Sequence, residues 1–477
     1  MRRAYIAKLL MIVLVLALLI AGSGYGYFYY QEKPEPSLQL SSFPVVQKQT
    51  RLLVIAPHCD DETLGCAGLI QAVLQAGGAV QVVVVTNGDG FTFAVERQFH
   101  RLFLKADDYV ESGYVRQKET VRALAYLGLQ PEQITFLGYP DRGLNALWLD
   151  YWDSNRPYHS RYTDTEYTPY DNSYQQKVPY AGENVLSGLE QLMRSFKPTL
   201  IMAPHPADEH ADHAAVWAFA ATAFMHLQGS GELSSTARLD TYLVHRGDFP
   251  IPHGYRPEAA LLPPRPLYKN RETEWQVQAL SAQAMTVKEQ AVKAYTSQLQ
   301  VPVMSSLLLS FIRSNELFGR TSIPEINSEP VLDATSLNTW LNKPSFLIAS
   351  RGVNWLGVIE GNAKIAAVGG LVQGNRLWLR FHIPDYSERQ HTYQVSLITF
   401  GRERQGVWRQ RKAFSFSTAE SDLAEGDILR FPNDVVVRLT YTDRQPLPDF
   451  FLLQVTTRDS LGLMLDHTVW QPVRVVL

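Results

Sequence analysis

The first half of the chain alternates short apolar runs with longer stretches of helical periodicity. Residues 79–86, AVQVVVVT, form a nearly continuous β-branched run, which is typical of a strand buried on both faces of a parallel sheet. Other strands are predicted over residues 52–56, 134–137, 199–203 and 241–245, and helices over residues 63–75, 115–127, 183–196, 212–226 and 285–298. This alternation predicts an α/β domain over residues 50–325, with a Rossmann-like, doubly wound, mostly parallel sheet and helices on both faces.

The pattern changes beyond about residue 330. Short β-rich runs recur between turns of Gly, Asn, Asp and Pro, and no convincing amphipathic helix separates them. The runs cover residues 345–349, 365–368, 377–382, 393–400, 435–441, 450–457 and 473–477. Short strands at this spacing predict a β-sandwich-like C-terminal domain over residues 330–477.

The N-terminus shows a third pattern. Three basic residues precede an uncharged stretch, residues 9–30, that begins LLMIVLVLALLIA and ends in aromatic residues. About 20 apolar residues cross a bilayer, so residues 1–30 are predicted to form a transmembrane helix that anchors the chain, with a cytoplasmic N-terminus. The alternative is a cleaved signal peptide, and we favour the retained anchor because the uncharged stretch continues past any cleavage site. Residues 31–49, which carry several Pro, Ser and Gln, are predicted to be a linker.

These features limit where the protein can be located and which partners it can bind. A retained anchor predicts a single-pass protein of the cell membrane with its folded part outside the cytoplasm, and cleavage would make the protein secreted. The 44 Lys and Arg nearly balance the 47 Asp and Glu, and no basic stripe lies along a predicted helix, so no nucleic-acid partner is expected. The two cysteines, Cys59 and Cys66, exclude a disulfide framework.

Acidic and histidine side chains gather directly after two predicted strands. The first cluster, in APHCDDETLG, contains His58, Asp60, Asp61 and Glu62. The second cluster, in PHPADEHADH, contains His205, Asp208, Glu209, His210, Asp212 and His213. A lone Asp after a strand more often caps a helix, but the carboxyl ends of parallel strands meet at one edge, where ligands bind. Two such clusters therefore favour a divalent metal site, with Zn²⁺ as the expected ion and Fe²⁺ possible.

The motifs resemble those of the PIG-L/LmbE-like family of zinc-dependent N-acetylglucosamine de-N-acetylases. PHCDDE and HADH match the paired motifs of the family, and further similarity follows in family order in TNGDG, VRQKETVRAL, LGYPDRGL and KAYTSQ. The resemblance covers residues 51–320 and implies an LmbE-like fold and N-deacetylase activity. No part of it extends over the C-terminal domain.

The resemblance implies a role for each matched residue. His58, Asp61 and His213 match the zinc ligands. Asp60 matches the general base that takes a proton from the metal-bound water. His210 matches the histidine that supports the oxyanion and protonates the leaving amine. This division of labour suits amide hydrolysis, because zinc activates water and polarises the carbonyl, while a nearby carboxylate and a positively charged histidine assist.

Four further residues follow from the same resemblance. Arg116 and Asp141 match positions that contact sugar hydroxyls in relatives. Asp208 and Asp212 are expected behind the ligands, where they would orient the imidazole of His213 or of His210.

Some positions depart from the family pattern or carry two interpretations. Cys59 and Ala211 replace usual prolines, and Cys59 is predicted to be a packed thiol rather than a ligand. Glu209, at a position often basic in relatives, disfavours a phosphate-bearing substrate. The aromatic loop over residues 148–180 either contacts glycan or packs on itself. His245 either points into the pocket or is a hydrogen-bonded structural residue.

The sequence therefore predicts a metal-dependent hydrolase that removes acetyl groups from N-acetylated amino sugars of an extracytoplasmic glycan or glycoconjugate. One alternative is a non-catalytic glycan-binding or scaffold protein on the same fold. The other is a zinc amidase that acts on a non-sugar acylated amine.

Overall fold

The computed structural model describes most of the chain beyond residue 40. The described residues are 11–12, 14–16, 18–19, 22, 40–247, 249–267, 273–329, 340–341, 365–384, 391–403, 406–417, 420–424, 426–442 and 446–477. The predicted anchor lies almost wholly outside these residues, as does the strand predicted over residues 345–349. Within them, no helix combines the length and the apolar content that a membrane span requires.

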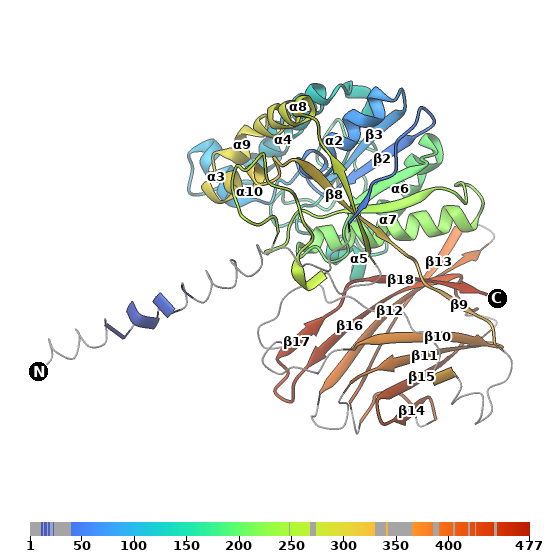
Figure 1. Ribbon diagram of the computed structural model, residues 1–477. Coiled ribbons are helices and arrows are strands. Elements are labelled where there is room, and N and C mark those ends of the chain that lie inside the picture. Colours follow the sequence, from blue (N-terminus) through green and yellow to red (C-terminus); the bar gives the residue numbers. More distant parts are fainter. Residues whose placement is uncertain are drawn as a thin grey trace, which may run out of the picture.

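An eight-stranded sheet forms the upper part of the molecule (Figure 1). Its strands are β1 (Ser41–Ser42), β2 (Arg51–Ala56), β3 (Ala79–Thr86), β4 (Ile134–Tyr139), β5 (Leu200–Pro204), β6 (Arg238–Tyr242), β7 (Thr273–Ala279) and β8 (Asn315–Thr321). Their order is β1-β7-β8-β6-β5-β2-β3-β4, and only β8 runs antiparallel to its neighbours. The short β1 falls within the segment predicted as a linker. β2 and β5 are parallel neighbours, and the strand order reverses there, because β3 and β4 follow on one side and β6 on the other. Ligands bind α/β sheets at such a point.

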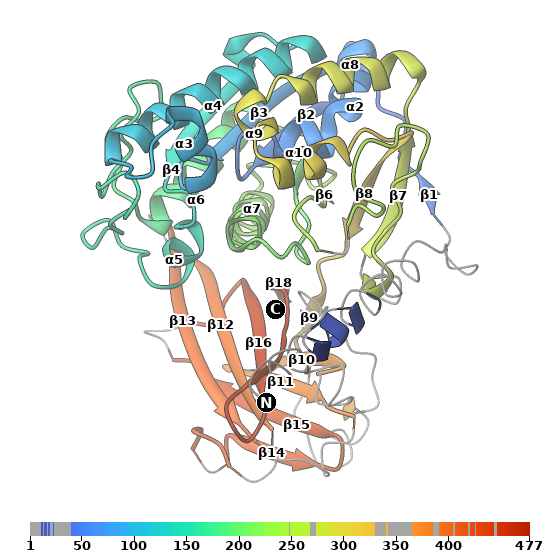
Figure 2. The same ribbon diagram turned by 90° about the vertical axis from the view of Figure 1, so that its left-hand side faces the viewer.

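Helices cover both faces of this sheet (Figure 2). They are α2 (Asp61–Gln75), α3 (Thr92–Phe99), α4 (Ala106–Leu127), α5 (Leu144–Leu149), α6 (Gly182–Phe196), α7 (Ala211–Gly229), α8 (Ala282–Lys293), α9 (Thr296–Leu299) and α10 (Pro302–Leu309). Alternation along β2 explains the two faces, because Leu52 and Val54 pack with α2, α4 and α8, whereas Leu53 and Ile55 pack with α6 and α7. The predicted doubly wound α/β sheet is confirmed.

Two β-sheets face each other in the lower part of the molecule. Their strands are β9 (Glu325–Asn327), β10 (Ala367–Gln373), β11 (Arg376–His382), β12 (Thr392–Glu403), β13 (Gly406–Phe416), β14 (Ile428–Phe431), β15 (Asp434–Thr440), β16 (Phe450–Arg458), β17 (Met464–His467) and β18 (Gln471–Val476). The orders are β10-β11-β15-β14 and β13-β12-β16-β18-β9, with β17 beside β16. All pairs are antiparallel except β9 with β18. Alternate side chains of both sheets form one apolar core, as in a sandwich.

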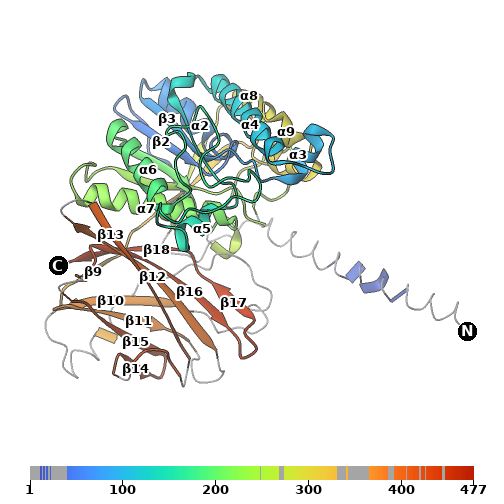
Figure 3. The same ribbon diagram turned by 180° about the vertical axis from the view of Figure 1, so that it is seen from behind.

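The two parts meet where α5 and α7 lie against β12, β16 and β18 (Figure 3). The indole of Trp217 donates a hydrogen bond of 2.9 Å to the carbonyl of Trp470. Arg409 donates to the carbonyl of Trp148 at 2.5 Å and lies over the ring of Trp152 at 4.2 Å. Because one apolar cluster runs across this junction, the lower sheets form part of the support of α5 and α7.

Candidate metal centre

The two acidic-histidine clusters meet because their strands are neighbours. β2 pairs with β5 in parallel, with Leu52 opposite Leu200 and Val54 opposite Met202. Both strands therefore end at the same edge, and the helices that follow, α2 and α7, begin side by side there. This places the first turn of each helix at one point.

His58, Asp61 and His213 face that point with one atom each. Asp61 Oδ2 lies 3.2 Å from His58 Nδ1 and 3.1 Å from His213 Nε2. The two nitrogen atoms lie 3.3 Å apart. Zinc bonds of about 2.0–2.1 Å in tetrahedral geometry separate ligand atoms by about 3.3 Å. The three residues therefore fit one triangular face of a tetrahedral zinc site.

Carboxylates hold the far nitrogen of each imidazole. His58 Nε2 lies 3.3 Å from Asp141 Oδ1 and 3.4 Å from Asp212 Oδ2. His213 Nδ1 lies 3.0 Å from Asp208 Oδ2. Asp208 thus lies behind His213 as expected, whereas Asp212 contacts His58 rather than the His213 or His210 that we expected. Such contacts fix the ring orientation and make the imidazole a stronger ligand.

The same carboxylates favour protonated imidazoles when no cation is bound. Burial lowers the pKa of His213, but Asp208 and Asp61 outweigh it and raise that pKa to about 9. Burial also opposes charge on His58, yet Asp141, Asp212 and Asp61 raise its pKa well above the usual value. The site therefore requires positive charge, which two protons or one divalent cation can supply.

Asp60 lies beside the ligands in a strained conformation. It precedes α2 with a φ of 117°, and its amide donates to Glu62 at 3.2 Å. Arg116 donates to its carboxylate at 3.0 Å. Burial, together with the neighbouring Asp61, raises the pKa of Asp60 to about 8 against the effect of Arg116. Strain of this kind, about 1–3 kcal/mol, gathers at functional sites, and the raised pKa suits a general base.

His210 presents a fixed nitrogen to the same cavity. It caps α7 by accepting the amide of Asp212 on Nδ1 at 3.2 Å, so its hydrogen is on Nε2. Burial and the charges of His58 and His213 lower its pKa to about 4. His210 is therefore neutral at pH 7, and the expectation of a positively charged histidine does not hold for the protein without metal.

Arg116 and Asp141 line a cavity of about 220 Å³ together with His58, Asp60 and His210. Both side chains make hydrogen bonds to backbone groups of the protein. Arg116 donates to the carbonyls of Cys59 at 2.5 Å and of Gly88 at 2.8 Å. Asp141 accepts the amide of Gly90 at 2.8 Å. The two residues thus join the motifs around the cavity and border the space in which a substrate would lie.

Three further residues have clear places in the structure. Cys59 packs in the apolar core, and burial raises the pKa of its thiol to about 12, in agreement with a packed thiol. Glu119 accepts hydrogen bonds of 2.7 Å from Thr296 and from Ser297, which joins VRQKETVRAL to KAYTSQ. His205, in the second cluster, stacks on Trp275 with ring centroids 4.9 Å apart and lies outside the site.

His245 is a site residue that the sequence left open. Its Nε2 lies 3.7 Å from Asp61 Oδ1. With His58, Asp61 and His213 it forms a group of ligand atoms that all lie within 4.8 Å of one another. The sequence carried a signal for this position, because His245 follows a strand of the same sheet edge, as both clusters do.

A groove of about 730 Å³ continues outward from the cavity, and His210 and His245 border both. Its far wall is the apolar side of α10, with Pro302, Val303 and Leu307. The aromatic loop does not line this groove or the cavity. Its residues Trp148, Tyr170 and Tyr180 are buried, which supports the packing interpretation for these three.

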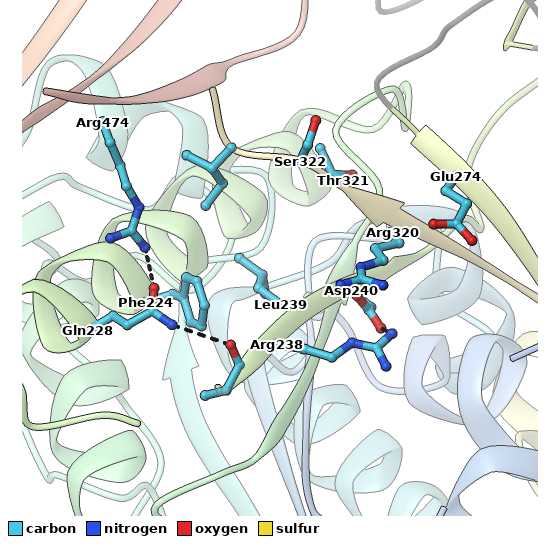
Figure 4. Close-up of a pocket in the computed structure, with 12 residues that line it drawn as sticks. Phe224, Gln228, Arg238, Leu239, Asp240, Glu274, Arg320, Thr321, Ser322 and Arg474 are labelled. Carbon is cyan, nitrogen blue, oxygen red and sulfur yellow. Dashed lines mark hydrogen bonds and ion pairs between the residues drawn. The ribbon is translucent and has the colours of Figure 1, made fainter. Parts of the chain in front are cut away.

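A contrasting pocket of about 450 Å³ lies at the opposite end of β6 (Figure 4). We call it the seam pocket, and its charged residues are Arg238, Asp240, Glu274, Arg320 and Arg474. Arg238 is ion-paired with Asp240, and Arg474 donates to Gln228. No group of metal-ligating side chains occurs among the residues that line it.

Comparisons with known proteins were made for the whole chain. Residues 53–224 match the family model described as GlcNAc-PI de-N-acetylase, PIG-L. No curated protein matches the chain. Among solved structures, the chain is similar to N,N′-diacetylchitobiose deacetylase from Pyrococcus horikoshii, with 17% identity over 56% of this chain and 82% of that one and a TM-score of 0.35.

Two other solved structures are similar to the chain. One is the A40926 pseudoaglycone deacetylase Dbv21, with 20% identity over 57% of this chain and 99% of that one and a TM-score of 0.34. The other is GalB, the 4-carboxy-2-hydroxymuconate hydratase from Pseudomonas putida KT2440, with 14% identity over 55% and 83% and a TM-score of 0.34. At this level of similarity, the activities of these proteins are not assigned to this chain.

Proposed function

Because residues 53–224 form a domain of the PIG-L/LmbE-like de-N-acetylase family, we propose that the chain removes acetyl groups from N-acetylated amino sugars of a glycan or glycoconjugate. The predictions of the family and of the enzyme class, an N-deacetylase and thus a hydrolase, are confirmed. The amino-sugar substrate and the use of zinc rather than iron are our proposals. The observation that carries them is the triangle of His58, Asp61 and His213, with Asp60 and His210 in the same cavity.

The protein groups around the cavity suit amide hydrolysis. A zinc ion held by His58, Asp61 and His213 would supply a Lewis acid for the carbonyl and for the attacking water. Asp60 would accept the proton of that water, since its carboxylate is fixed by Arg116 at 3.0 Å. His210 would donate from Nε2 to the oxygen that becomes negative, because its Nδ1 is already occupied by the amide of Asp212.

The nitrogen must receive a proton as the C–N bond breaks and the amine departs. Asp60, once protonated, and His210 border the cavity together and are the groups that can deliver it. Burial favours the protonated form of Asp60 and the neutral form of His210. This favours Asp60 as the group that carries the proton from water to amine.

The size of the groove supports a substrate larger than one sugar unit. The cavity of about 220 Å³ next to the ligands suits an acetyl group and part of a sugar ring, and the adjoining groove offers about 730 Å³ more. Glu209 and Arg246 both border this groove and lie 4.0 Å apart, so neither sign of charge dominates there. We therefore favour a neutral glycan chain.

The proposal also places the folded domains outside the cytoplasm. It rests on the basic residues that precede the apolar stretch of residues 9–30. Fusion of alkaline phosphatase to the C-terminus tests it, because that reporter is active only after export. An inactive fusion that is present at normal abundance would place the C-terminus in the cytoplasm.

Acetate release tests the function. The zinc-loaded full chain is incubated with N-acetylglucosamine oligomers, with the Asp60→Ala variant as the control for catalysis. Release by the native chain and not by the variant is expected. Binding of the oligomers without release would support the scaffold alternative, and release only from N-acetylated compounds without a sugar would support the amidase alternative.

A further inference from the structure

The position of His245 is fixed by the same residue that orients a zinc ligand. Its backbone amide and that of Val244 donate to Asp208 Oδ2 at 2.9 and 3.2 Å. The carbonyl of His245 accepts the amide of Glu209 at 2.8 Å. Asp208 also contacts His213 Nδ1 at 3.0 Å. One carboxylate therefore sets the spacing between the His213 ring and the backbone of His245.

An oxygen of Asp61 lacks a partner on the side that His245 faces. Asp61 Oδ2 contacts both His58 and His213, whereas the buried Oδ1 makes no hydrogen bond among the described residues. His245 Nε2 stands 3.7 Å from it, too far for a hydrogen bond. A buried carboxylate oxygen without a hydrogen bond is costly, and a cation bound by both oxygens of Asp61 and by His245 Nε2 would satisfy Oδ1.

We propose that His245 is a fourth protein ligand of the metal, added to His58, Asp61 and His213. The inference rests on the metal site of the proposed function and adds to the three ligands that the family resemblance implies. A fourth protein ligand would hold the ion more firmly, and zinc can expand its coordination to admit water as well.

Metal affinity and cobalt spectra test this ligand separately from activity. The full chain is compared with His245→Ala and with His253→Ala, which removes a histidine of the same groove. We expect zinc affinity, measured by competition with a coloured chelator, to fall at least about tenfold in His245→Ala and to stay unchanged in His253→Ala. The visible spectrum of the Co²⁺-loaded protein should change only in His245→Ala.

The outcomes separate the ligand from the site as a whole. Unchanged affinity and spectrum in His245→Ala would overturn the fourth ligand and leave the other three in place. Unchanged affinity in Asp61→Ala would overturn the metal site and the proposed function with it. If His245→Ala unfolds, His245→Gln replaces it, since an amide keeps the volume and is a poor zinc ligand.

A second inference comes from a different part of the surface. α3 and the loop after it expose large apolar side chains: Phe93 is 70% exposed, Leu102 83% and Phe103 92%. The same stretch, residues 93–105, contains three basic residues, Arg97, Arg101 and Lys105, and one acidic residue, so its net charge is +2. Of the three, Arg101 is ion-paired with Asp108 at 2.5 Å. Apolar tips among basic side chains are typical of protein surfaces that lie on anionic lipid.

This stretch borders the entrance to the site. Phe91, directly before α3, lines the cavity together with His58, Asp60 and His210. α3 also lies beside α9, which carries Gln298 of the same cavity (Figure 2). We infer that residues 93–105, called the rim segment, rest on the surface of an anionic bilayer and turn the cavity toward it. This inference does not depend on the identity of the substrate.

A fluorescent label on the rim segment reports such contact even though other parts of the chain can bind membranes. The full chain carries an environment-sensitive dye on Phe103→Cys or, as the control, on Leu461→Cys, which is equally exposed on the lower domain. Both native cysteines are buried. With vesicles that contain phosphatidylglycerol, a blue shift is expected for position 103 and none for position 461. Equal shifts at both positions, or none at 103, would overturn the inference.

Discussion

The two ends of the eight-stranded sheet differ in their balance of acidic and basic side chains. At the carboxyl ends of β2, β4 and β5, six carboxyl groups are buried: Asp60, Asp61, Glu62, Asp141, Asp208 and Asp212. Arg116 is ion-paired with Asp60 of this group, and the imidazoles of His58 and His213 contact Asp61 and Asp208. In the seam pocket at the other end of β6, three arginines surround two acids, Asp240 and Glu274.

The difference separates a binding site from a structural pocket. Several carboxylates buried together are unstable unless protons or a cation balance their charge, and a divalent metal can supply that balance. The seam pocket has one more positive than negative charge and pairs its buried acid, Asp240, directly with Arg238. Pocket volume alone would not distinguish the two, since the seam pocket, at about 450 Å³, is the larger of the two cavities. The balance of acidic and basic side chains does distinguish the metal site from the seam pocket.

The strongest way to break this comparison is to remove a ligand. Asp61→Ala and His213→Ala should each abolish metal binding at micromolar zinc and with it all metal-dependent acetate release, because only three atoms form the central triangle. Metal content after dialysis and acetate release are the measurements. Retained zinc with full activity in either variant would show that the triangle is not the metal site.

Asp60→Asn separates catalysis from metal binding. The amide keeps the shape and cannot accept a proton, so activity should fall about 10²- to 10³-fold. Zinc content should stay at the native level. Among the described residues, two groups of side chains could hold a metal, and Asp60 belongs to neither: His58, Asp61, His213 and His245, and His58, His210 and Asp212. Loss of zinc in this variant would instead make Asp60 a ligand.

The pH dependence of zinc affinity tests whether the imidazoles of the metal site carry protons when no metal is bound. Without metal, His213 holds a proton up to a pKa of about 9, and the pKa of His58 is also raised. Zinc must displace these protons, so affinity should rise with pH, about tenfold per unit for each displaced proton between pH 6 and 8. Chelator competition at several pH values measures it. A flat profile would contradict the protonated imidazoles.

Asp208→Asn tests the support behind a ligand and should have a smaller effect. Asp208 contacts His213 Nδ1 at 3.0 Å, and an amide there holds the ring less firmly. Loss of such a partner costs about 10- to 100-fold in metal affinity. Chelator competition again measures the change, and Asp240→Asn in the seam pocket is the matched control. Equal affinity in both variants would remove Asp208 from the support of the site.

The sequence predicted the site better than its surroundings. Strand composition and the position of the two clusters predicted that distant segments meet, and the strand pairing of β2 with β5 is the reason that they do. Helix bounds were less accurate: the helix predicted over residues 285–298 breaks between α8 and α9. The strand predicted over residues 241–245 ends at Tyr242, which leaves His245 in a loop.

The partners behind the ligands could not be predicted, for a physical reason. Asp212 is one residue from His213, yet its carboxylate contacts His58 and accepts the amides of Arg142 and Leu144 at 2.6 and 3.1 Å. Neighbouring residues at the start of a helix point in different directions, about 100° apart. Only the packing of α5 against α7 brings these amides within reach of Asp212.

A substitution in the seam pocket should have the smallest effect, and it tests whether that pocket is purely structural. Asp240→Asn leaves the shape of the pocket and removes the charge that Arg238 contacts. Because the Arg238 side chain is partly exposed, stability should fall by only about 1 kcal/mol, measured by urea unfolding. Acetate release should stay within about twofold of the native rate, since variants without shared contacts act independently. A tenfold loss of activity with normal stability would instead show that the seam pocket is coupled to the metal site through β6. Charge balance would then no longer separate structural pockets from functional ones in this fold.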